Sequence, residues 1–243
     1  MAASYVHSDH DSEDSSEDEC MVQVGLSEVF TPARLTARCR AFGLEPGENF
    51  DIVNGCDLGT IEGRGAVQRH LDLHAPKCVV LSPPCTMFSR LMASNRSRMD
   101  PDIYNQRLAH GRSLLHFAIA ICWKQLRRGD YFLLEHPASA DSWREPQMLK
   151  LMRATGVIVS TFDQCRFGLK APFTELPIQK KTRFVHNMPA VDQLFGNAMC
   201  QCVVPHQHVE GSICGVKLST YCQVYNEVLC QAMLHGIRAE IPL

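Results

Sequence analysis

The sequence predicts an α/β fold in which a mostly parallel sheet carries helices on both faces. Short apolar runs alternate with longer amphipathic stretches, and Gly, Pro and Asn mark the boundaries between them. The chain of 243 residues is long enough to bury one hydrophobic core. Strands and helices that alternate in this way are joined by right-handed crossovers. Ligands of such sheets bind outside the carboxyl ends of the strands, so the residues just after each strand are the candidates for function.

Turn-forming residues divide the chain into the expected elements. The strands are expected at residues 27–30, 49–53, 77–82, 130–137, 157–162 and 182–186. The helices are expected at residues 33–44, 65–74, 103–129 and 145–156. Pro32 near the start of the first helix and Gly43 near its end occupy positions that these residues favour. The longest helix is expected to bury one face, because apolar residues recur there at helical spacing: Leu108, Leu115, Ala118, Ile119 and Cys122.

The composition is that of a globular protein in a reducing compartment. Apolar residues make up 45% of the chain and charged residues 21%. No stretch approaches the roughly 18 unbroken apolar residues of a membrane span, and no signal-peptide pattern opens the chain, so no membrane partner is expected. Twelve cysteines without regular spacing argue against a secreted disulfide framework and favour the nucleus or the cytoplasm.

Residues 1–20 form an acidic, serine-rich tail that is expected to be disordered. The stretch 8–19 contains seven acids, and residues 1–20 contain no Lys or Arg. Such a segment cannot bury enough apolar surface to order itself. Removing the seven acids from the total of 26 leaves 19 against 24 basic residues, so residues 21–243, the expected folded domain, carry about +5. A mildly basic domain is compatible with nucleic-acid binding.

A cysteine and a carboxylate are expected at one edge of the sheet. Cys85 follows the strand at 77–82 after two prolines, and Glu135 lies near the end of the strand at 130–137. Both side chains should therefore face a single crevice. A thiolate there can add to an electron-poor aromatic ring while a carboxyl of raised pKa hydrogen-bonds a ring nitrogen. An inert core cysteine and an ordinary strand-end acid are the alternatives.

The sequence around these two residues resembles the DNA cytosine-C5 methyltransferases, which use S-adenosylmethionine. The segment PPCTMFS resembles that family's Pro-Cys-Gln-x-Phe-Ser loop, with Thr86 in place of Gln. LLEHP resembles the Glu-Asn-Val motif, with His136 and Pro137 in place of Asn and Val. The resemblance implies a Rossmann-like methyltransferase fold. It also implies that Cys85 attacks carbon 6 of a flipped-out cytosine in DNA and that Glu135 is the partner of ring nitrogen 3.

The segment PIQKKTRF resembles the family's Gln-x-Arg-x-Arg motif. Gln179 and Arg183 match it, and Lys181 stands where the first Arg would be. By this resemblance Lys181 and Arg183 hold the cytosine carbonyl and the neighbouring phosphate. An ammonium in place of a guanidinium loses the bidentate fork, so this contact differs from the family's.

The first strand and the turn after it resemble the family's cofactor-binding Asp-x-Phe-x-Gly segment. In SEVFTPARL, Glu28 and Phe30 take the places of the acid and of the aromatic residue that packs on the adenine. Pro32 replaces the glycine that would let the backbone approach the cofactor. Pro84, in the loop before Cys85, is also expected to line the S-adenosylmethionine site.

A carboxylate that binds the ribose hydroxyls is expected near the end of the second strand. Asp51 and Asp57 both lie there. Asp57, in GCDLGTI, also resembles the family's later Gly-Asp-Ile segment. The two aspartates are open alternatives.

The matching segments follow the family's order over about residues 26–187, but two parts of the family's pattern are missing. Only about a dozen residues separate Arg183 from Gly196, where the family inserts the domain that reads the DNA sequence. The late Arg-x-Leu-Thr type segment is missing as well. The chain therefore resembles a minimal or truncated catalytic domain, of the kind found inside the polyproteins of mobile elements such as retroelements.

Other functions stay open. A catalytically inactive relic that binds nucleic acid or a partner is favoured by Pro32 and by the missing recognition domain, whereas the intact Cys85 and Glu135 favour an enzyme. An amino-methyltransferase would carry a Pro-Pro-aromatic motif at the same strand end, but a cysteine cannot stack on a base. Phe88 and Ser89 after the cysteine favour the carbon-5 reaction. RNA in place of DNA is a further alternative substrate.

A second cluster, CQCVVPHQH, predicts a metal site at residues 200–208. Cys200, Cys202, His206 and His208 supply sulfur and nitrogen ligands in the number that closes a tetrahedral zinc site. The spacing is not one of the common zinc patterns, so the chain would have to turn at Pro205 to bring them together. A loop of ordinary histidines and half-buried cysteines is the alternative.

Overall fold

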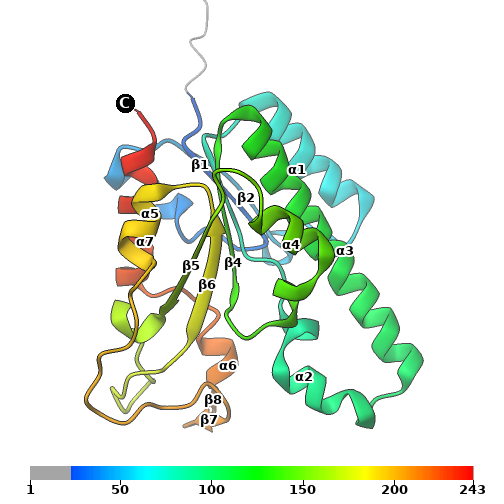
Figure 1. Ribbon diagram of the computed structural model, residues 1–243, viewed down its shortest axis with the longest axis vertical. Helices are drawn as coiled ribbons and strands as arrows, with labels where there is room; N and C mark the ends of the chain where they lie inside the picture. Colours follow the sequence, from blue (N-terminus) through cyan, green and yellow to red (C-terminus); the bar gives the residue numbers. More distant parts are fainter. Residues whose placement is uncertain (1–22, 243) are drawn as a thin grey trace, which may run out of the picture.

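The structure is a computed structural model that describes residues 23–242. The predicted disordered tail at residues 1–20 lies outside the described residues. Figure 1 shows a central sheet between two layers of helices, with a small lobe at one end of the sheet. Within the described part of the chain, no helix combines the length and the apolar character that crossing a membrane requires.

The sheet contains all the predicted strands in the order β2-β1-β3-β4-β6-β5. Neighbours among β2, β1, β3 and β4 run parallel, and only β6 is reversed, pairing antiparallel with both β4 and β5. The prediction of a mostly parallel α/β sheet is therefore confirmed. The strands are β1 (Leu26–Val29), β2 (Pro46–Phe50), β3 (Cys78–Leu81), β4 (Tyr131–Pro137), β5 (Ile158–Asp163) and β6 (Lys181–His186).

Helices cover both faces of the sheet, as predicted, and each face has its own apolar core (Figure 1). On one face pack α1 (Ile61–His74), α3 (Pro101–Arg128) and α4 (Pro146–Met152). On the other face pack α5 (Pro189–Phe195), α7 (Glu227–Glu240) and the 3-10 helix Thr36–Phe42.

The long helix α3 follows from its sequence. The Asp100 carboxylate accepts hydrogen bonds from the backbone N–H groups of Asp102 and Ile103, and Pro101 occupies the first turn. Gly129 ends the helix with a φ of 72°, a left-handed conformation that glycine adopts without strain. The predicted apolar face is buried, apart from the half-buried Leu108.

Strand β2 begins earlier than the sequence predicts, at Pro46 rather than at residue 49. Proline and glycine are poor strand formers, which is why the pattern did not include them. Gly47 is required for close approach, because a Cβ there would lie 2.6 Å from the Val24 side chain and also collide with Ser27. Tight pairing with β1 therefore overrides the weak local propensity of the residues that start β2.

The other differences concern helices, and α2 (Arg90–Asn95) and α5 (Pro189–Phe195) are not among the predicted elements. The helix expected at 33–44 is the shorter 3-10 helix Thr36–Phe42. The prediction stops before α7, although Asn226 caps that helix and apolar residues recur on one face: Leu229, Cys230, Met233, Leu234 and Ile237.

A small lobe extends beyond the ends of β5 and β6. It contains the hairpin β7 (Ser212–Ile213) and β8 (Val216–Lys217) together with α6 (Leu218–Tyr221). Its own apolar cluster consists of Leu169, Ala171, Ile178, Leu218 and Cys222. Figure 1 shows this lobe and α2 (Arg90–Asn95) on either side of the lower end of the sheet.

Candidate active site at the carboxyl ends of the strands

The order of the strands places the expected ligand crevice of an open α/β sheet between β1 and β3. From β1 the chain connects to β2, its neighbour on one side, and from β2 it crosses to β3 on the other side of β1. The connections therefore reverse direction between β1 and β3. Ligands of open α/β sheets bind at such a point, outside the carboxyl ends of the strands. The segments that border the crevice are therefore the turn after β1 and the loop after β3.

Glu28 anchors the turn after β1 from inside the protein. Its side chain is fully buried, and Oε2 accepts hydrogen bonds from the backbone N–H groups of Arg34, Leu35 and Thr36 at 2.8 to 3.0 Å. The Thr36 hydroxyl donates a further bond of 2.6 Å to the same oxygen. Glu28 Oε2 therefore shapes the loop, and Glu28 Oε1 is buried without a hydrogen-bond partner among the described residues, so the prediction that Glu28 contacts a cofactor stays a prediction.

Phe30 ends β1 in an unusual backbone conformation. Its φ is 66°, in the left-handed region that bulky residues rarely adopt. The half-buried ring packs edge to face on Phe117 of α3, with ring centroids 6.3 Å apart. Backbone strain of this kind clusters at ligand sites and is kept only where the surroundings enforce it.

Asp51 and Asp57 occupy different places in the loop after β2. Asp51 follows the last residue of β2 directly and is half-buried, and its Oδ1 accepts a hydrogen bond of 2.8 Å from the Val53 N–H. Asp57 is exposed farther along the loop, and its Oδ1 bonds the Gly59 N–H at 2.7 Å. The strand-end position favours Asp51 as the carboxylate that faces the crevice.

His136 fastens the loop that carries Cys85 to β4. Its Nε2 lies 2.7 Å from the Pro83 carbonyl oxygen, and its Nδ1 lies 2.7 Å from the Ser142 hydroxyl. Burial lowers the pKa of His136 to about 4, so the ring is neutral at neutral pH. Because a carbonyl only accepts, the network assigns the proton to Nε2. The residue that replaces the family's Asn therefore orients the Pro83-Pro84-Cys85 loop, and Pro84 itself is exposed.

Cys85 lies at the start of a 3-10 turn, Thr86–Phe88, and is half-buried. Burial raises the pKa of the Cys85 thiol, and the Glu135 carboxylate raises it further, whereas the Lys180 ammonium lowers it. The Glu135 and Lys180 charges thus both act on the Cys85 thiol. The structure brings together the cysteine and the carboxylate that the sequence placed at one sheet edge.

Glu135 is a nearly enclosed carboxyl near the end of β4. Its exposed fraction is 7%, and burial raises its pKa, while the Lys180 ammonium and the Tyr225 hydroxyl oppose the rise. Lys180 Nζ lies 3.9 Å from Glu135 Oε1. That oxygen is buried and has no hydrogen-bond partner within residues 23–242. A buried carboxyl with a free oxygen is able to share a proton with a ligand.

The cation beside Glu135 is Lys180, not Lys181 or Arg183. Lys180 is largely buried and also donates to the Cys222 carbonyl oxygen at 2.8 Å, whereas Lys181 is exposed. This corrects the assignment of Lys181 to the base. The Gln-x-Arg-x-Arg spacing selects positions 179, 181 and 183. Lys180, which lies beside Glu135, falls between two of these positions.

Arg183 lies on the other face of the sheet. In the ladder between β4 and β6, Arg183 is opposite His136, and Phe184 is opposite Glu135. Directly opposed side chains share a face and neighbours alternate, so Arg183 and Glu135 point apart. The Arg183 guanidinium lies 5.3 Å from the Trp143 ring centroid, and its Nε donates to the Thr161 hydroxyl at 3.2 Å. The expectation that Arg183 holds the base beside Glu135 is corrected accordingly.

Tyr225 is a member of this site that the sequence did not reveal. It is buried, and its hydroxyl forms a 2.8 Å hydrogen bond with the Ser82 hydroxyl at the end of β3. Burial raises the pKa of Tyr225, and the negative charge of Glu135 adds to the rise. Tyr225 precedes α7, and no local motif marks it, because its contact with β3 depends on the tertiary fold.

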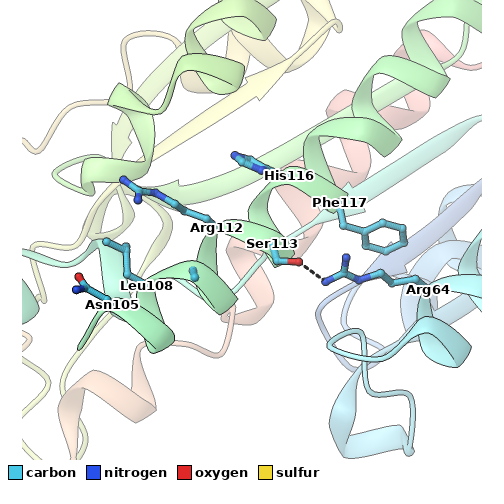
Figure 2. Close-up of a pocket in the computed structure, with 8 residues that line it drawn as sticks. Arg64, Asn105, Leu108, Arg112, Ser113, His116 and Phe117 are labelled. Atoms are coloured by element: carbon cyan, nitrogen blue, oxygen red, sulfur yellow. Dashed lines mark hydrogen bonds between the residues drawn. The ribbon is translucent and has the colours of Figure 1, made fainter. Parts of the chain in front are cut away.

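A separate hollow lies on the outer side of α3, where the side chains of α1 and α3 meet (Figure 2). Its volume is about 750 Å³, and Arg64 spans it by donating to the Ser113 hydroxyl at 2.8 Å. The Arg64 guanidinium also lies 5.4 Å from the Phe117 ring centroid. Because Cys85 and Glu135 do not line this hollow, it is not the place for a reacting base.

A cluster of thiols and an imidazole lies at the end of β5. Cys165, Cys200, Cys202 and His206 bring their potential ligand atoms within 4.8 Å of one another. His208, which the sequence included, is not in the cluster, and Cys165 takes its place. The sequence pattern missed Cys165 because it comes from the 3-10 turn Gln164–Phe167 that follows β5, remote from the other ligands along the chain.

The comparisons with known proteins identify no family. No family model matches the chain, and the search of curated proteins returns no significant match. The functional argument therefore depends on the motifs, the fold and the side-chain geometry described above.

Proposed function

We propose that this chain transfers a methyl group from S-adenosylmethionine to carbon 5 of cytosine in DNA through a covalent Cys85 adduct. The observation that carries the proposal is the pairing of Cys85 with Glu135. Strands β3 and β4 are neighbours with Leu81 opposite Leu134, so the Cys85 loop leaves the sheet beside Glu135. The Glu135 charge raises the pKa of the Cys85 thiol, and Glu135 Oε1 has no hydrogen-bond partner among the described residues, so it can meet a ligand.

The two residues support a proton-balanced attack on the pyrimidine ring. The Cys85 thiol gives its proton to the Glu135 carboxylate, and the sulfur forms a bond to carbon 6. The Glu135 carboxyl then donates that proton to ring nitrogen 3, so that the electron pair displaced from the carbon 5–carbon 6 bond makes carbon 5 nucleophilic. The pKa of Glu135, which burial raises, suits this role, because a carboxylate of raised pKa accepts a proton more readily and can then pass it on.

The same groups reverse these steps to release the product. S-adenosylmethionine, when bound, supplies the methyl group that carbon 5 acquires. Carbon 5 then loses its proton to solvent, the bond between Cys85 and carbon 6 breaks, and the proton on nitrogen 3 returns to Glu135. Lys180 beside Glu135 stabilises the carboxylate form, so that Glu135 can pass this proton back to the Cys85 thiolate and begin the next cycle as a carboxylate.

The residues of the crevice fit this cofactor. Asp51 follows β2 directly, and at that position a carboxylate accepts hydrogen bonds from ribose hydroxyls in dinucleotide-binding folds. Phe30 presents an aromatic ring at the end of β1 from a strained backbone, and Pro84 is exposed on the neighbouring loop. Glu28 supports the turn between them by holding three backbone N–H groups.

DNA is the proposed substrate because the reaction requires an extruded base and a positive rim. The domain outside the acidic tail carries about +5. Lys181 is exposed at the start of β6, where an ammonium would contact phosphate rather than the base. A cytosine must leave the duplex stack to reach Cys85. A single-stranded RNA would meet the same crevice, so it belongs in the same test.

Trapping on 5-fluorocytosine tests the proposal. A fluorine at carbon 5 cannot leave as a proton, so the Cys85 adduct should accumulate on a fluorinated DNA oligonucleotide with S-adenosylmethionine present. We expect a covalent complex that withstands denaturing electrophoresis, vanishes in Cys85→Ser and persists in Cys56→Ser, which removes another partly buried thiol. The absence of an adduct on DNA and on RNA, despite measured cofactor binding, would contradict the enzymatic proposal.

A second candidate is a domain that binds its ligands without chemistry. It is favoured by the raised pKa of Cys85, since a nucleophilic thiol is usually activated by a lowered one. Cofactor and oligonucleotide binding by calorimetry, with no adduct and no labelled methyl on the oligonucleotide, would support it. Labelled methyl on an exocyclic amino group would instead indicate an amino-methyltransferase.

A further inference from the structure

The cluster at the end of β5 joins two segments that are distant in sequence. Cys165 belongs to the 3-10 turn Gln164–Phe167, and Cys200, Cys202 and His206 belong to the loop between α5 and β7. The Cys200 Sγ and the His206 Nε2 are 3.2 Å apart, and all four potential ligand atoms lie within 4.8 Å of one another. These residues are outside the Cys85 crevice, and the proposed methyl transfer does not use them.

We propose that Cys165, Cys200, Cys202 and His206 bind a structural Zn²⁺ ion. Zinc in proteins is held tetrahedrally by sulfur at about 2.3 Å and nitrogen at about 2.0 Å, which puts neighbouring ligand atoms roughly 3.3 to 3.8 Å apart. In the observed cluster one sulfur–nitrogen pair is already 3.2 Å apart and no pair of ligand atoms is farther apart than 4.8 Å, so shifts of about 1 Å at most bring all four to these separations. Three sulfurs and one imidazole nitrogen also complete the coordination, so the site is closed and structural rather than catalytic.

Backbone and carboxylate contacts already hold the ligands in place. The Asp163 carboxylate accepts a hydrogen bond of 2.9 Å from the Cys200 N–H, and the Asp163 N–H donates to the Ala198 carbonyl at 3.1 Å. The Cys202 N–H points at the Cys200 Sγ from 3.4 Å. Asp163 is itself buried at the end of β5. Such outer contacts orient metal ligands and reduce the cost of assembling the site.

The small lobe buries too few apolar side chains to be strongly stabilised by its core alone. Its apolar cluster contains few side chains, and Val203 and Val204 of the ligand loop remain exposed rather than adding to it. Units with so little apolar core are commonly stabilised by a metal or by disulfides. All the described cysteines are free thiols, so the metal is the available cross-link.

The metal would also fix the position of Lys180. The backbone N–H of Gln164, which precedes Cys165, donates to the Lys180 carbonyl at 3.0 Å. The Lys180 ammonium reaches the Cys222 carbonyl of the same lobe. The Cys165 turn therefore connects the zinc ligands to the cation that lies beside Glu135.

Metal content of the purified full-length chain tests the proposal. After expression with zinc and extensive dialysis, we expect about one zinc per chain in the unmodified protein. The same content is expected in His208→Ala and Cys214→Ser, which remove a histidine and an exposed cysteine near the cluster. Cys165→Ser and Cys200→Ser should lose most of it. An unmodified protein without zinc overturns the site, and retention in Cys165→Ser or loss in His208→Ala overturns the ligand assignment.

Cobalt substitution and hydrogen exchange on the unmodified chain guard against variants that fail to fold. Co²⁺ exchanged into the site should give the visible bands of a tetrahedral ion and a thiolate charge-transfer band. In variants that keep His206 but lack one of the three cysteines, the intensity of the charge-transfer band should fall by about one third. A zinc chelator should increase amide exchange in 164–180 and 197–222 and leave α1 and α3 unchanged. Octahedral cobalt, or exchange that is unaffected by the chelator, would contradict the proposal.

Discussion

The crevice at β3 and β4 and the cluster at β5 use cysteine in opposite ways. Cys85 is a single thiol beside a buried carboxyl, and that charge together with burial raises its pKa. Cys165, Cys200 and Cys202 instead crowd around one another and an imidazole. A thiol beside an acid is suited to add to a substrate and to exchange its proton with that acid. Several thiolates close together repel one another, and their proximity becomes favourable when a cation neutralises their charge. The environment, not the residue type, separates the two chemistries.

The largest expected effect is the loss of methyl transfer when the Glu135 carboxyl is replaced, a change that touches the crevice and not the cluster. Glu135→Gln keeps the shape of the side chain but cannot carry the thiol proton to the ring. We expect methyl transfer to fall by about 10³-fold, within the range that general acid–base groups contribute. Zinc content should be unchanged, because Glu135 is not a ligand of the cluster. Transfer measured with labelled S-adenosylmethionine, beside metal analysis, checks both halves, and a variant with full activity would remove Glu135 from the mechanism.

Acid should destabilise the sheet through two buried imidazoles. Burial lowers the pKa values of His136 and His186 from 6.5 to about 4. Both are neutral in the folded state, whereas the unfolded chain takes up protons near pH 6.5, so stability is fully present above that pH and is lost as the pH falls toward 4. Each histidine contributes up to about 3 kcal/mol to this loss.

Denaturant unfolding at several pH values measures the slope. In His136→Asn, the number of protons taken up on unfolding between pH 6.5 and pH 4 should fall by about one. The Pro83-Pro84-Cys85 loop should also loosen, because the hydrogen bond to the Pro83 carbonyl is lost. His206→Asn, in the cluster, serves as the matched variant of the other region and should leave the contribution of His136 in place. An unchanged slope in His136→Asn would mean that His136 is accessible to protons in the folded state.

The sequence predicted those parts of the molecule that depend on residues close to one another along the chain. The sequence predicted each strand of the six-stranded sheet but not the short hairpin β7–β8, and it predicted Cys85 and Glu135 together because residues after adjacent parallel strands meet at one edge. Lys180 was missed because a motif spacing selected Lys181, and one residue along a strand reverses the face. Cys165 was missed because no local pattern links the turn after β5 to the later loop that holds the other ligands.

The charges around Cys85 should control how fast it is alkylated. Glu135→Gln removes a negative charge and should lower the thiol pKa, and Lys180→Met removes a positive charge and should raise it. We expect a faster reaction with iodoacetamide at pH 8 in the first variant and a slower one in the second, since the rate follows the fraction of thiolate. Mass spectrometry of the Cys85 peptide isolates this thiol from the others. Equal rates in all three proteins would place Cys85 beyond the influence of both charges.

The smallest expected effect decides between the two aspartates of the cofactor loop. If Asp51 holds the ribose hydroxyls, Asp51→Asn should weaken S-adenosylmethionine binding by about five- to tenfold, the value of one typical hydrogen bond, because the amide oxygen can still accept in place of the carboxylate. Asp57→Asn removes an exposed carboxylate of the same loop and should leave the affinity unchanged. Each aspartate caps its own turn, so a thermal melt must first show that both variants fold equally well. Calorimetric titration then compares them, and the reverse order of affinities would assign the ribose to Asp57 and move the cofactor along the loop, away from the end of β2.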